Sequence, residues 1–498
     1  MRAARDTLLD ERDTAMATNF IEEPSDVDDD QFDAWYIDVI KRAGMMDNSP
    51  VAGCRVFKPY GYGLWENMQR RLDDRFKETG VENAYFPMFI PETMFNKEVE
   101  HIEGFAPEVA WVTMGGNKQL EERLAVRPTS ESIICPIYAE WVQSYRDLPI
   151  LINQWCSVVR WEERPRSFLR TREFLWQEGH TAHATAEEAE ERALMMIDVY
   201  NDFYVNELAI PCVMGRKSES EKFAGALRTY TLESMMRGKK WALQSCTSHN
   251  LGDHFGKTFN IQFLAPSGER EFAWSTSWGL SWRAIGAIIM VHGDQSGLQM
   301  PPRVAPVQAV VVPIWRTDEA KQQVFEASAQ IERALKAAGV RVKVDRDAEH
   351  TPGWKFNEWE LKGVPLRIEV GPRDVAAGQA VVVRRDNRVK EPVPLEGFTA
   401  RVQELLEDVH HTLYGRALNF QKENSASVTS YDELKERVAA NAGFSYIFWD
   451  GDPATEERIK QETKATIRCI PLHDNDEEGP DLFTGKTVKG RVLVDRAY

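Results

Sequence analysis

The stretch FLRTREFLWQEGHTAH, residues 168–183, constrains the fold of this chain more than any other part of the sequence. Side chains of a β-strand point alternately to the two faces of a sheet. One face of a strand here would carry Arg170, Arg172, Phe174, Trp176, Glu178 and His180. Cations, then aromatic rings, then a carboxylate and an imidazole suit neither a dry core nor a solvated surface. This order indicates a binding pocket with a cationic end and an aromatic wall.

The segment just before this stretch extends the pattern. In VVRWEERPRSF, Arg160 and Glu162 lie two residues apart on a predicted strand, and a charged loop leads to a second strand starting near Arg170. An antiparallel pair with arginine at both ends of the loop can clamp a polyphosphate, because guanidinium groups match phosphate oxygens and stay charged. A solvated hairpin with cross-strand ion pairs is the alternative, but it leaves the aromatic and acidic residues further along unexplained.

The length of 498 residues exceeds one ordinary domain and predicts about three. A hydrophobic content of 43% supplies material for buried cores. No apolar run approaches the roughly 20 residues of a membrane span, and the N-terminal residues form no apolar signal segment. We therefore expect a cytoplasmic protein with no membrane partner.

The formal net charge of -17 does not exclude a nucleic-acid partner, because the acidic residues are concentrated in two segments. Residues 1–33 contain eleven acidic and three basic side chains, and residues 471–483 contain five acidic side chains and no Lys or Arg. The rest of the chain is close to neutral and permits local basic surfaces. We expect residues 1–33 to be a disordered acidic extension, with either Met1 or Met16 as the true start.

The six cysteines are scattered, and no two of them form a C-x-x-C pair: Cys54, Cys135, Cys156, Cys212, Cys246 and Cys469. This spacing predicts reduced thiols and builds neither a disulfide framework nor a zinc site. We therefore expect no metal held by protein cysteines.

Helical and strand patterns divide the chain into three folded parts. Residues 34–300 mix helices with short strands: 63–80 predicts an amphipathic helix, and AYFPMFIP (84–91) predicts a strand ended by proline. The proline-rich PPRVAP opens a second part, 301–408, in which strands alternate with helices as in a small α/β domain. A last part, 409–498, opens with a helical pattern.

Four further segments offer polar side chains suited to a pocket. LAVRPTSES contains Thr129 and Glu131, although a helix N-cap explains such a sequence equally well. HGDQSGLQMPPR ends on Arg303 after two glycines, which alone is a weak signal. LQSCTSHNLGDHF and WSTSWGLSWRAIG add an amide, two hydroxyls and an imidazole: Gln244, Thr247, Ser277 and His249.

Taken together, these strings resemble a known family. A helix and strand closing on YFP, then R-x-E, a loop and R-x-x-x-F, then a late glycine-rich stretch ending in arginine are similar to motifs 1, 2 and 3 of class II aminoacyl-tRNA synthetases. RPTSE, FLRTREFLWQEGHTAH, TSHNLG, TSWGLS and PGWKFNEWELKGVPLRIEVGPRD narrow the resemblance to prolyl-tRNA synthetases of the archaeal/eukaryotic type. This resemblance implies an α+β catalytic domain built on an antiparallel sheet (34–300). It further implies an α/β anticodon-binding domain (301–408) and a small α+β C-terminal domain (409–498).

The resemblance implies the reaction of a proline--tRNA ligase: ATP-dependent activation of L-proline to prolyl-adenylate, then transfer to the 3′ end of tRNA(Pro) in translation. By analogy, three arginines hold the ATP phosphates: Arg160, Arg170 and Arg303, the last at the γ-phosphate. Glu162 would seat the adenine, while Gln244 and Thr247 would reach the ribose or the Mg²⁺ region.

The same resemblance assigns the proline site. Thr129 and Glu131 would accept hydrogen bonds from the secondary ammonium of proline, which needs acceptors once it is desolvated. The ring pocket, which Arg160 also borders, would be lined by Phe174, Trp176, Glu178, His180, His249 and Ser277. For His180, a purely structural histidine stays open as the alternative.

Further expectations concern partners. Lys355, Arg367 and Glu369 would lie near the anticodon, although an ordinary surface charge explains each of them equally well. The similarity to motif 1 implies a homodimer.

The C-terminal part departs from many relatives, which place four cysteines there. Because this chain lacks them, we expect no structural zinc. Stability would come instead from packing of residues such as Phe448, Trp449 and Leu493. In some relatives the terminal tyrosine reaches the active site, so Tyr498 is a candidate for the same position.

Bacterial-type relatives insert an editing domain between motifs 2 and 3. Only about ninety residues separate His180 from Trp274 here, and they already contain helices and TSHNLG. We therefore expect no editing domain and no hydrolysis of alanyl-tRNA by this chain.

Two other functions stay open. A synthetase for threonine would use zinc ligands to bind the substrate hydroxyl, and no suitable Cys/His set is apparent. A catalytically silent relative that only binds tRNA would be expected to lose a phosphate-binding arginine, whereas all three candidates are present.

Overall fold

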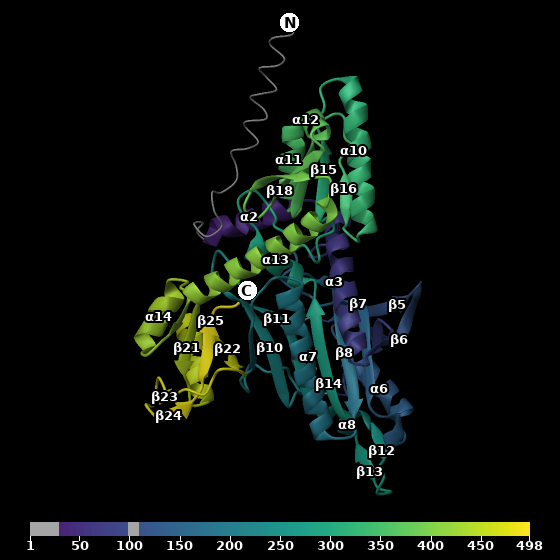
Figure 1. The fold of residues 1–498 in the computed structure, drawn as a ribbon. Coiled ribbons are helices and arrows are strands. Elements are labelled where there is room, and N and C mark those ends of the chain that lie inside the picture. The colour runs from purple at the N-terminus through teal and green to yellow at the C-terminus, as the bar shows by residue number, and fades with distance from the viewer. Residues whose placement is uncertain (1–28, 98–108) are drawn as a thin grey trace.

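The computed structural model describes residues 29–97 and 109–498. A large sheet forms the lower part of the molecule in Figure 1, and a smaller sheet with its own helices lies above it. The large sheet has eleven strands, which lie in the order β20 (Ser425–Ser427), β21 (Phe444–Phe448), β25 (Arg491–Asp495), β22 (Thr466–Pro471), β9 (Val213–Arg216), β10 (Arg228–Met235), β11 (Ala242–Gly252), β14 (Trp274–Ser281), β8 (Glu173–His183), β7 (Ile150–Val159) and β3 (Glu82–Asn83).

The predicted hairpin around residues 160–170 is confirmed, but its strands are shorter than expected. Strands β7 and β8 pair antiparallel from Ile150↔Ala182 to Val159↔Glu173. Strand β8 begins at Glu173 rather than near residue 170. Arg160 and Glu162 follow the end of β7, so their placement on a strand was wrong. The connecting segment is nevertheless held, because Arg160 N–H donates to the carbonyl of Arg172 at 2.8 Å.

Helix α7 (Ala186–Asn206) covers one face of the large sheet, in front of β11 and β14 in Figure 1. Two contacts fix this face: Tyr200 of α7 donates to the Gln177 side chain at 2.8 Å, and Ser248 donates to the Ala193 carbonyl at 2.7 Å. Because strand side chains alternate, the neighbours of Gln177 and Ser248 point to the opposite face. The polar residues of the candidate site therefore lie away from α7.

The N-terminal helices differ from expectation in detail. Helix α2 (Asp29–Arg42) includes the last five residues of the predicted disordered extension, and residues 1–28 lie outside the described residues. Within α2, Phe32 is buried and Asp33 lies 2.6 Å from Arg166 and 3.0 Å from Lys239. These contacts stabilise the helical conformation of this acidic segment.

The region of the first predicted motif also differs. Helix α3 (Pro59–Glu78) begins four residues before the predicted start, because Pro59 stands at the first helical position, where proline needs no hydrogen-bond donor. The predicted single strand at 84–91 was wrong, since residues 84–88 lie between β3 and β4 (Phe89–Pro91) and belong to neither. Strand β4 joins β6 (Lys118–Val126) and β5 (Ala110–Gly115) in a separate three-stranded sheet.

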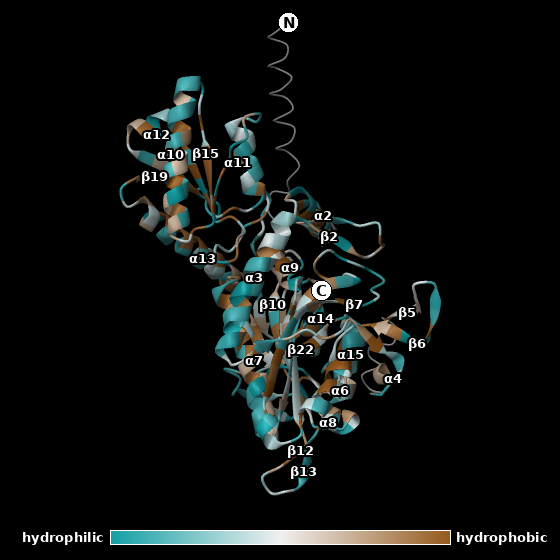
Figure 2. Cartoon of the chain, turned by 90° about the vertical axis from the view of Figure 1, so that its right-hand side faces the viewer, coloured by the Kyte–Doolittle hydropathy of each residue, from teal (hydrophilic) through white to brown (hydrophobic). Residues whose placement is uncertain are grey.

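The second part is the predicted small α/β domain. Its five strands lie in the order β16 (Val342–Val344), β15 (Ala309–Pro313), β17 (Leu366–Val370), β18 (Gln379–Arg384) and β19 (Lys390–Pro394). Strands β16, β15 and β17 run parallel to one another. Strand β18 pairs antiparallel with β17, and β19 pairs antiparallel with β18. Figure 2 shows the apolar strand β15 between α10 (Asp318–Ala337), whose outer surface is polar, and α11 (Pro352–Leu361). Helix α12 (Pro372–Ala376) contacts α10, whereas α11 packs through Trp359 on Val310 and Val312, on the face of the sheet opposite α10.

Helix α13 (Phe398–Glu423) crosses the boundary predicted between residues 408 and 409. Its first half packs on the five-stranded sheet through residues such as Phe398 and Leu405, while Ala417 belongs to the core beneath the large sheet. The last part then completes the large sheet, because β22 pairs antiparallel with β9 at Ile470↔Arg216. The C-terminal residues are therefore continuous with the large sheet.

The remaining elements are short. They are the β-ribbons β1 (Met46–Asn48) with β2 (Arg55–Phe57), β12 (Gln262–Leu264) with β13 (Arg270–Phe272) and β23 (Glu478–Pro480) with β24 (Thr487–Lys489), the 3₁₀ turn η2 (Tyr145–Asp147), and the helices α4 (Glu92–Phe95), α6 (Glu131–Trp141), α8 (His254–Phe259), α9 (Arg283–His292), α14 (Tyr431–Ala439) and α15 (Pro453–Thr463). No helix in the described part of the chain combines the length and apolar character that crossing a membrane requires.

Candidate active site

A cavity of about 320 Å³ lies on the face of the large sheet opposite α7. Strands β8, β11 and β14 supply most of its floor. Eleven of the residues predicted from the sequence line it: Thr129, Glu131, Arg160, Phe174, Trp176, Glu178, His180, Gln244, Thr247, His249 and Ser277. Residues from five separate segments of the chain thus converge on one site.

The cationic end of the cavity has a second cavity, of about 220 Å³, beside it. Both cavities have Arg160 and Arg283 in their walls, and the second one adds Glu162 and Arg170. Arg283 donates to the backbone carbonyls of Leu169 and Gln244, which bear no charge that would neutralise it. Burial, with the positive charges of Arg170 and Arg160, lowers the pKa of Arg283 to about 10. Three guanidinium groups that repel one another in this way form a site for an anion.

An aromatic wall follows the arginines. The Arg160 guanidinium lies 5.5 Å from the Phe174 ring centre and 5.4 Å from that of Trp176, and its Nε donates to the Pro128 carbonyl. Phe174 and Trp176 meet edge to face at 5.9 Å. This is the order predicted along alternate residues of β8.

Buried carboxylates define the other end. Glu178 is only 2% exposed; its Oε1 accepts from Gln154 at 2.6 Å and from Ser130, and its Oε2 lies 3.0 Å from His180 Nε2. Glu131 accepts from the Thr129 hydroxyl. Burial lowers the pKa of His180, but the hydrogen bond to the Glu178 carboxylate and the charges of Glu131 and Glu178 outweigh it, so the pKa is raised overall. A cationic group is favoured beside these carboxylates.

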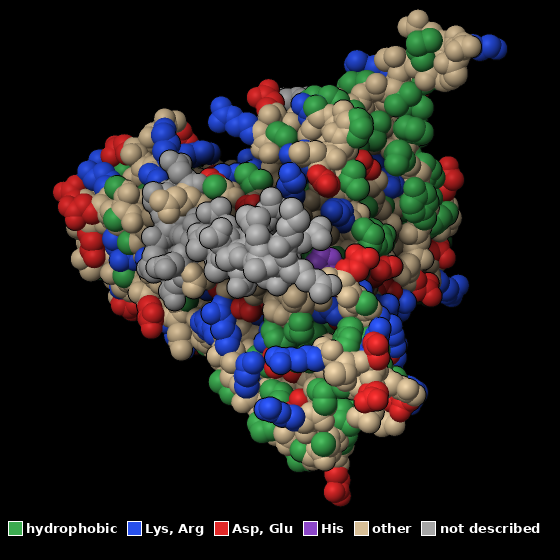
Figure 3. Space-filling view, turned by 90° about the horizontal axis from the view of Figure 1, so that it is seen from above, with side chains coloured by type: hydrophobic (Ala, Val, Ile, Leu, Met, Phe, Trp, Pro, Cys, Tyr) green, Lys and Arg blue, Asp and Glu red, His purple; other side chains and the backbone are tan. Residues whose placement is uncertain are grey.

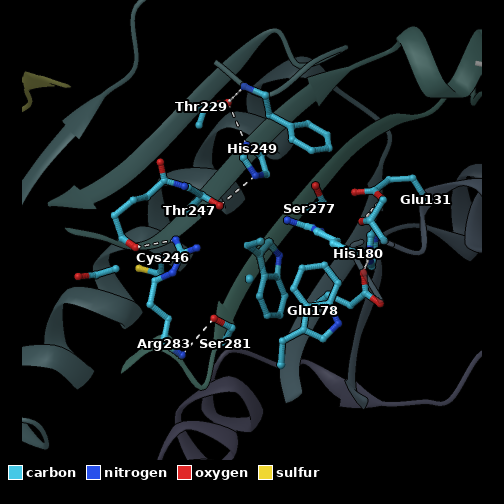
Figure 4. Close-up of a pocket in the computed structure, with 18 of the residues that line it drawn as sticks. Glu131, Glu178, His180, Thr229, Cys246, Thr247, His249, Ser277, Ser281 and Arg283 are labelled. Carbon is cyan, nitrogen blue, oxygen red and sulfur yellow. Dashed lines mark hydrogen bonds and ion pairs between the residues drawn. The ribbon is translucent and has the colours of Figure 1, made fainter. Parts of the chain in front are cut away.

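His249 is held in the opposite way. Its Nδ1 lies 2.9 Å from the Thr229 hydroxyl and its Nε2 lies 3.0 Å from the Thr247 hydroxyl. Burial, with the charges of His180 and Arg160, lowers the pKa of His249 to about 4, despite the opposing charge of Glu131. Figure 4 shows this chain of hydrogen bonds on one side of the cavity and the group of Glu131, Glu178 and His180 on the other. The neutral ring serves as a fixed wall.

The Ser277 hydroxyl is an unsatisfied polar group between these two sides. Ser277 is 4% exposed and lines the cavity, and its Oγ has no hydrogen-bond partner among the described residues. Because a buried hydroxyl without a partner costs free energy, a polar ligand group is expected opposite it.

Arg303 does not belong to the cavity, so the structure contradicts its predicted place at a phosphate. Its Nη1 donates to the carbonyl of Asn206 at 2.6 Å, and its Nη2 lies 2.7 Å from Glu407 of α13. Arg303 follows the glycine-rich stretch, and that stretch leads into the linker before the five-stranded sheet. Arg283, directly after β14 at the start of α9, lies in the walls of both cavities.

Sequence reasoning missed several lining residues. Arg283 stood in the string WSTSWGLSWRAIG, where a strand running into a helix was the available signal. Glu221 and Phe223 come from a segment without regular structure between β9 and β10, and no periodic pattern marks them. The set missed is Glu221, Phe223, Thr229, Ser245, Cys246, Trp278, Gly279, Ser281 and Arg283.

The residues predicted near an anticodon fall into two groups. Arg367 and Glu369 lie on β17 with their charged groups 3.0 Å apart, beside a cavity of about 200 Å³ that Arg367 lines. Lys355 is 1% exposed, and its Nζ donates to the Asp347 carbonyl and lies 3.5 Å from Asp345. Lys355 is therefore buried inside the domain, and a direct contact to RNA does not fit this position. Figure 3 looks down on this domain and shows several Lys and Arg side chains close together on its surface.

The C-terminal part is held by apolar packing. Leu493 and Cys469 are fully buried, and Phe448 stacks beneath the Arg491 guanidinium at 3.9 Å. Within residues 29–97 and 109–498, no three His, Cys, Asp or Glu side chains are placed to hold a metal ion. Tyr498 contacts the site through its backbone, since its carbonyl accepts from Arg170 Nη2 at 3.3 Å.

Comparison with known families agrees with this architecture. Residues 111–292 match the class II core domain of tRNA synthetases (G, H, P, S and T), and residues 308–405 match an anticodon binding domain. Residues 431–498 match the C-terminal domain of prolyl-tRNA synthetase. The fold and the site thus define a class II aminoacyl-tRNA synthetase.

Individual relatives narrow the class. The proline--tRNA ligase of Natranaerobius thermophilus is 54% identical over 443 residues, covering 89% of this chain and 91% of that protein. Those of Rubrobacter xylanophilus and Chloroherpeton thalassium are each 53% identical, covering 93% and 94% of this chain and 96% and 98% of those proteins. The chain belongs to the proline--tRNA ligase family.

Proposed function

We propose that this chain is a proline--tRNA ligase, which activates L-proline with ATP and transfers the prolyl group to the 3′ end of tRNA(Pro). The observation that carries the proposal is a pair of adjoining cavities with three arginines at one end and buried carboxylates at the other. Prolyl-adenylate has the matching layout, with a phosphate at one end and a secondary ammonium at the other.

The nucleotide belongs at the arginine end. Arg160, Arg170 and Arg283 bind the phosphates, since arginine offers bidentate donors and a permanent charge. Arg283 replaces Arg303 in this assignment. Glu162 is placed for the adenine, and Gln244 and Thr247 for the ribose.

Mg²⁺ would bind together with the nucleotide. Magnesium bound to a nucleotide needs only one or two protein oxygens, because water and phosphate fill the other positions. Among the described residues, no three His, Cys, Asp or Glu side chains are placed to bind a metal ion by themselves. We therefore treat MgATP as the substrate.

Proline belongs at the carboxylate end. Its ammonium group donates to Thr129 and Glu131, and the Ser277 hydroxyl gains a polar partner. Trp176, Phe174 and His249 enclose the ring. Glu178 and His180 bind each other and fix the shape of the pocket, so their role is to position other groups.

The chemistry follows from this placement. The proline carboxylate attacks the α-phosphorus of ATP, a carboxylate–phosphate bond forms, and pyrophosphate leaves. A terminal ribose hydroxyl of tRNA then attacks the carbonyl carbon, and AMP leaves. Positioning and charge neutralisation accelerate such displacements, so no protein nucleophile is required.

The five-stranded domain is the proposed tRNA contact. Arg367 and Glu369 are placed to contact the anticodon, and Glu369 can accept from a guanine edge. Lys355 supports the domain from within by holding Asp345 and the Asp347 carbonyl.

Four further features belong to the proposal. The chain is an archaeal/eukaryotic-type enzyme with catalytic (34–300), anticodon-binding (301–408) and C-terminal (409–498) domains. It lacks structural zinc, and it forms a homodimer through the region around Pro87. It acts in the cytoplasm.

Aminoacylation tests the proposal. Purified protein is incubated with MgATP, radiolabelled proline and a tRNA(Pro) transcript, and the label attached to RNA is followed. We expect label that depends on ATP and disappears with a transcript of another anticodon and acceptor sequence. Attachment of threonine in place of proline would contradict the assignment.

A further inference from the structure

The segment that joins β9 to β10, residues 217–227, forms one wall of the cavity; we call it the 217–227 loop. Its Glu221 and Phe223 side chains line the cavity. The Phe223 ring lies 4.6 Å from the His249 ring, and the Phe223 N–H donates to the Thr229 hydroxyl at 2.9 Å. The same hydroxyl bonds His249. The loop is therefore part of the proline end of the site.

The other side of this loop is bound by the C-terminal part. Glu456 of α15 is 5% exposed, and its carboxylate accepts from the Ser218 hydroxyl at 2.6 Å and from the Ser220 hydroxyl. Lys460, one turn later on the same helix, lies 3.5 Å from Glu221. Residues from about 235 positions further along the chain thus hold a wall of the cavity.

A second attachment lies at the base of the loop. Lys217 Nζ donates to the Arg468 carbonyl of β22 at 2.7 Å and lies 2.7 Å from Glu233. Glu233 also binds the Arg468 guanidinium at 2.9 Å, and all three side chains are buried. Removing one member would leave a buried charge without its partner, which damages the whole fold. Glu456 is the better site for an experiment.

The loop needs such anchors because it has no regular secondary structure. Its shape is set by contacts to other segments, and a buried carboxylate with two hydroxyl donors is a strong one. If the carboxylate were absent, residues 218–220 would lose two hydrogen bonds, and the backbone that carries Phe223 would gain freedom.

We propose that Glu456 is a positioning residue for the amino-acid site: it fixes the 217–227 loop through Ser218 and Ser220 and thereby places Phe223 against His249. This inference rests on the proposed function for its kinetic test. It predicts that the C-terminal part contributes to proline affinity without touching proline.

The kinetic test uses the full chain with Glu456→Gln, Ser218→Ala or Ser220→Ala, measured by proline-dependent ATP–pyrophosphate exchange. We expect the KM for proline to rise about fivefold or more, as for loss of about one hydrogen bond, and the KM for ATP to change less than about twofold. Glu457→Gln is the matched control, because Glu457 is the next residue on α15, is exposed and accepts a hydrogen bond from Gln461 of the same helix. It should match the wild type.

Hydrogen exchange gives a second test that does not depend on activity. In Glu456→Gln the amides of residues 217–227 should exchange faster than in the wild type, while those of α7 stay unchanged. If Glu456→Gln does not fold, the two serine variants carry both tests, since each removes one hydroxyl only.

The outcomes separate the two proposals. An unchanged KM for proline with unchanged exchange in the loop overturns the positioning role. An equal rise in both KM values with faster exchange throughout the chain also overturns it, because the effect is then general destabilisation. A wild type without proline-dependent exchange contradicts the proposed function alone, and hydrogen exchange then decides the role of Glu456.

Discussion

Three guanidinium groups, those of Arg160, Arg170 and Arg283, face the adjoining cavities at the centre of the molecule. Their mutual repulsion is unfavourable in the empty protein and becomes favourable when a polyphosphate lies among them. Arg303, by contrast, forms an ion pair with Glu407 on a partly exposed surface. Substitution of Arg283 and substitution of Arg303 should therefore affect ATP–pyrophosphate exchange very differently.

Arg283→Ala should lower the rate of ATP–pyrophosphate exchange by about a hundredfold or more, because a preorganised charge at the reacting phosphate is lost. Arg283→Lys should recover only part of this rate, since lysine offers no bidentate donor pair. Arg303→Ala is the matched control and should stay within about fivefold of the wild type, as for an exposed ion pair. Equal losses in Arg283→Ala and Arg303→Ala would refute this assignment.

Asp495 makes a prediction about pH. Burial raises the pKa of this carboxyl to about 8. Hydrogen bonds from the backbone of Arg496 and Ala242 and the charge of Arg468 oppose this shift only in part. The Oδ2 atom of Asp495 has no hydrogen-bond partner among the described residues. A raised pKa for an acid means that the folded state binds a proton more tightly than the unfolded state. The contribution to stability is therefore fully present below about pH 4 and is lost as the pH rises towards 8.

Asp495→Asn, which mimics the protonated acid, should raise the melting temperature at pH 8.5 by about 2 °C or more, and the gain should shrink at pH 5. Asp476→Asn is the control, because Asp476 is exposed and pairs with Lys489 at the surface. Thermal unfolding at both pH values checks this. A gain that does not depend on pH would speak against the raised pKa.

The residues of the cavity show what a single sequence can predict. The alternation along β8 placed Phe174, Trp176, Glu178 and His180 on one face correctly, because the period of a strand does not depend on the rest of the fold. The choice between Arg283 and Arg303 depended on how the chain turns after β14. Both arginines follow apolar and glycine-containing strings, and only the fold separates them by position.

At the scale of elements, the antiparallel pairs β7–β8 and β8–β14 set the geometry of the site. Gly179 is essential to their packing: a Cβ atom on it would lie 2.1 Å from the ring of Trp278. That ring is 1% exposed and packs 4.9 Å from Phe76 of α3. The floor of the cavity and the helix layer are thus joined through a residue without a side chain.

Gly179→Ala should destabilise the protein by about 1–3 kcal/mol or more, because the ring of Trp278 must move in a close-packed core. Gly415→Ala in α13 is the matched control. Nothing lies within 4 Å of its Cβ position, so the same change should be neutral or stabilise by about 0.5–1 kcal/mol. Chemical denaturation measures both, and an equal effect of the two substitutions would contradict this account of the packing.

Elements with strong periodicity were the predictable ones. The helix expected at 63–80 exists as α3, and its earlier start follows from Pro59 and residues before the apolar pattern. AYFPMFIP failed as one strand because its residues bind different sheets: β3 pairs with β7, whereas β4 pairs with β6. Such a choice between partners is decided by tertiary contacts, which a local pattern does not contain.

At the scale of the whole molecule, the three predicted parts are joined more closely than the sequence indicated. Helix α13 spans the boundary drawn at 408/409, and β22 extends the catalytic sheet through β9. Linkers rich in proline, such as PPRVAP, are visible in a sequence, whereas a helix shared by two cores is not. A wall of the cavity, the 217–227 loop, is therefore bound by residues of the C-terminal part.

The segment between β8 and β14 bears on accuracy in translation. It consists of α7, the large-sheet strands β9, β10 and β11, the helix α8, which packs against α6, and the separate ribbon β12–β13. Because a pocket for a pyrrolidine ring excludes the smaller alanine only through lost contacts, some alanine should be activated, at about 1–3 kcal/mol of discrimination per methylene. Because we expect no editing domain in this segment, alanyl-tRNA(Pro) presented to the purified protein should deacylate at the spontaneous rate. Faster deacylation would reveal an editing site in this chain.

On this assignment, the paired cavities activate proline and no other amino acid efficiently. ATP–pyrophosphate exchange over a panel of proline, threonine, alanine and serine tests it most directly, with Arg283→Ala as the inactive control. This account predicts exchange with proline far above that with threonine or serine, weak exchange with alanine, and collapse of all of it in the control. Exchange that is equal for threonine and proline, or that survives in Arg283→Ala, would contradict it.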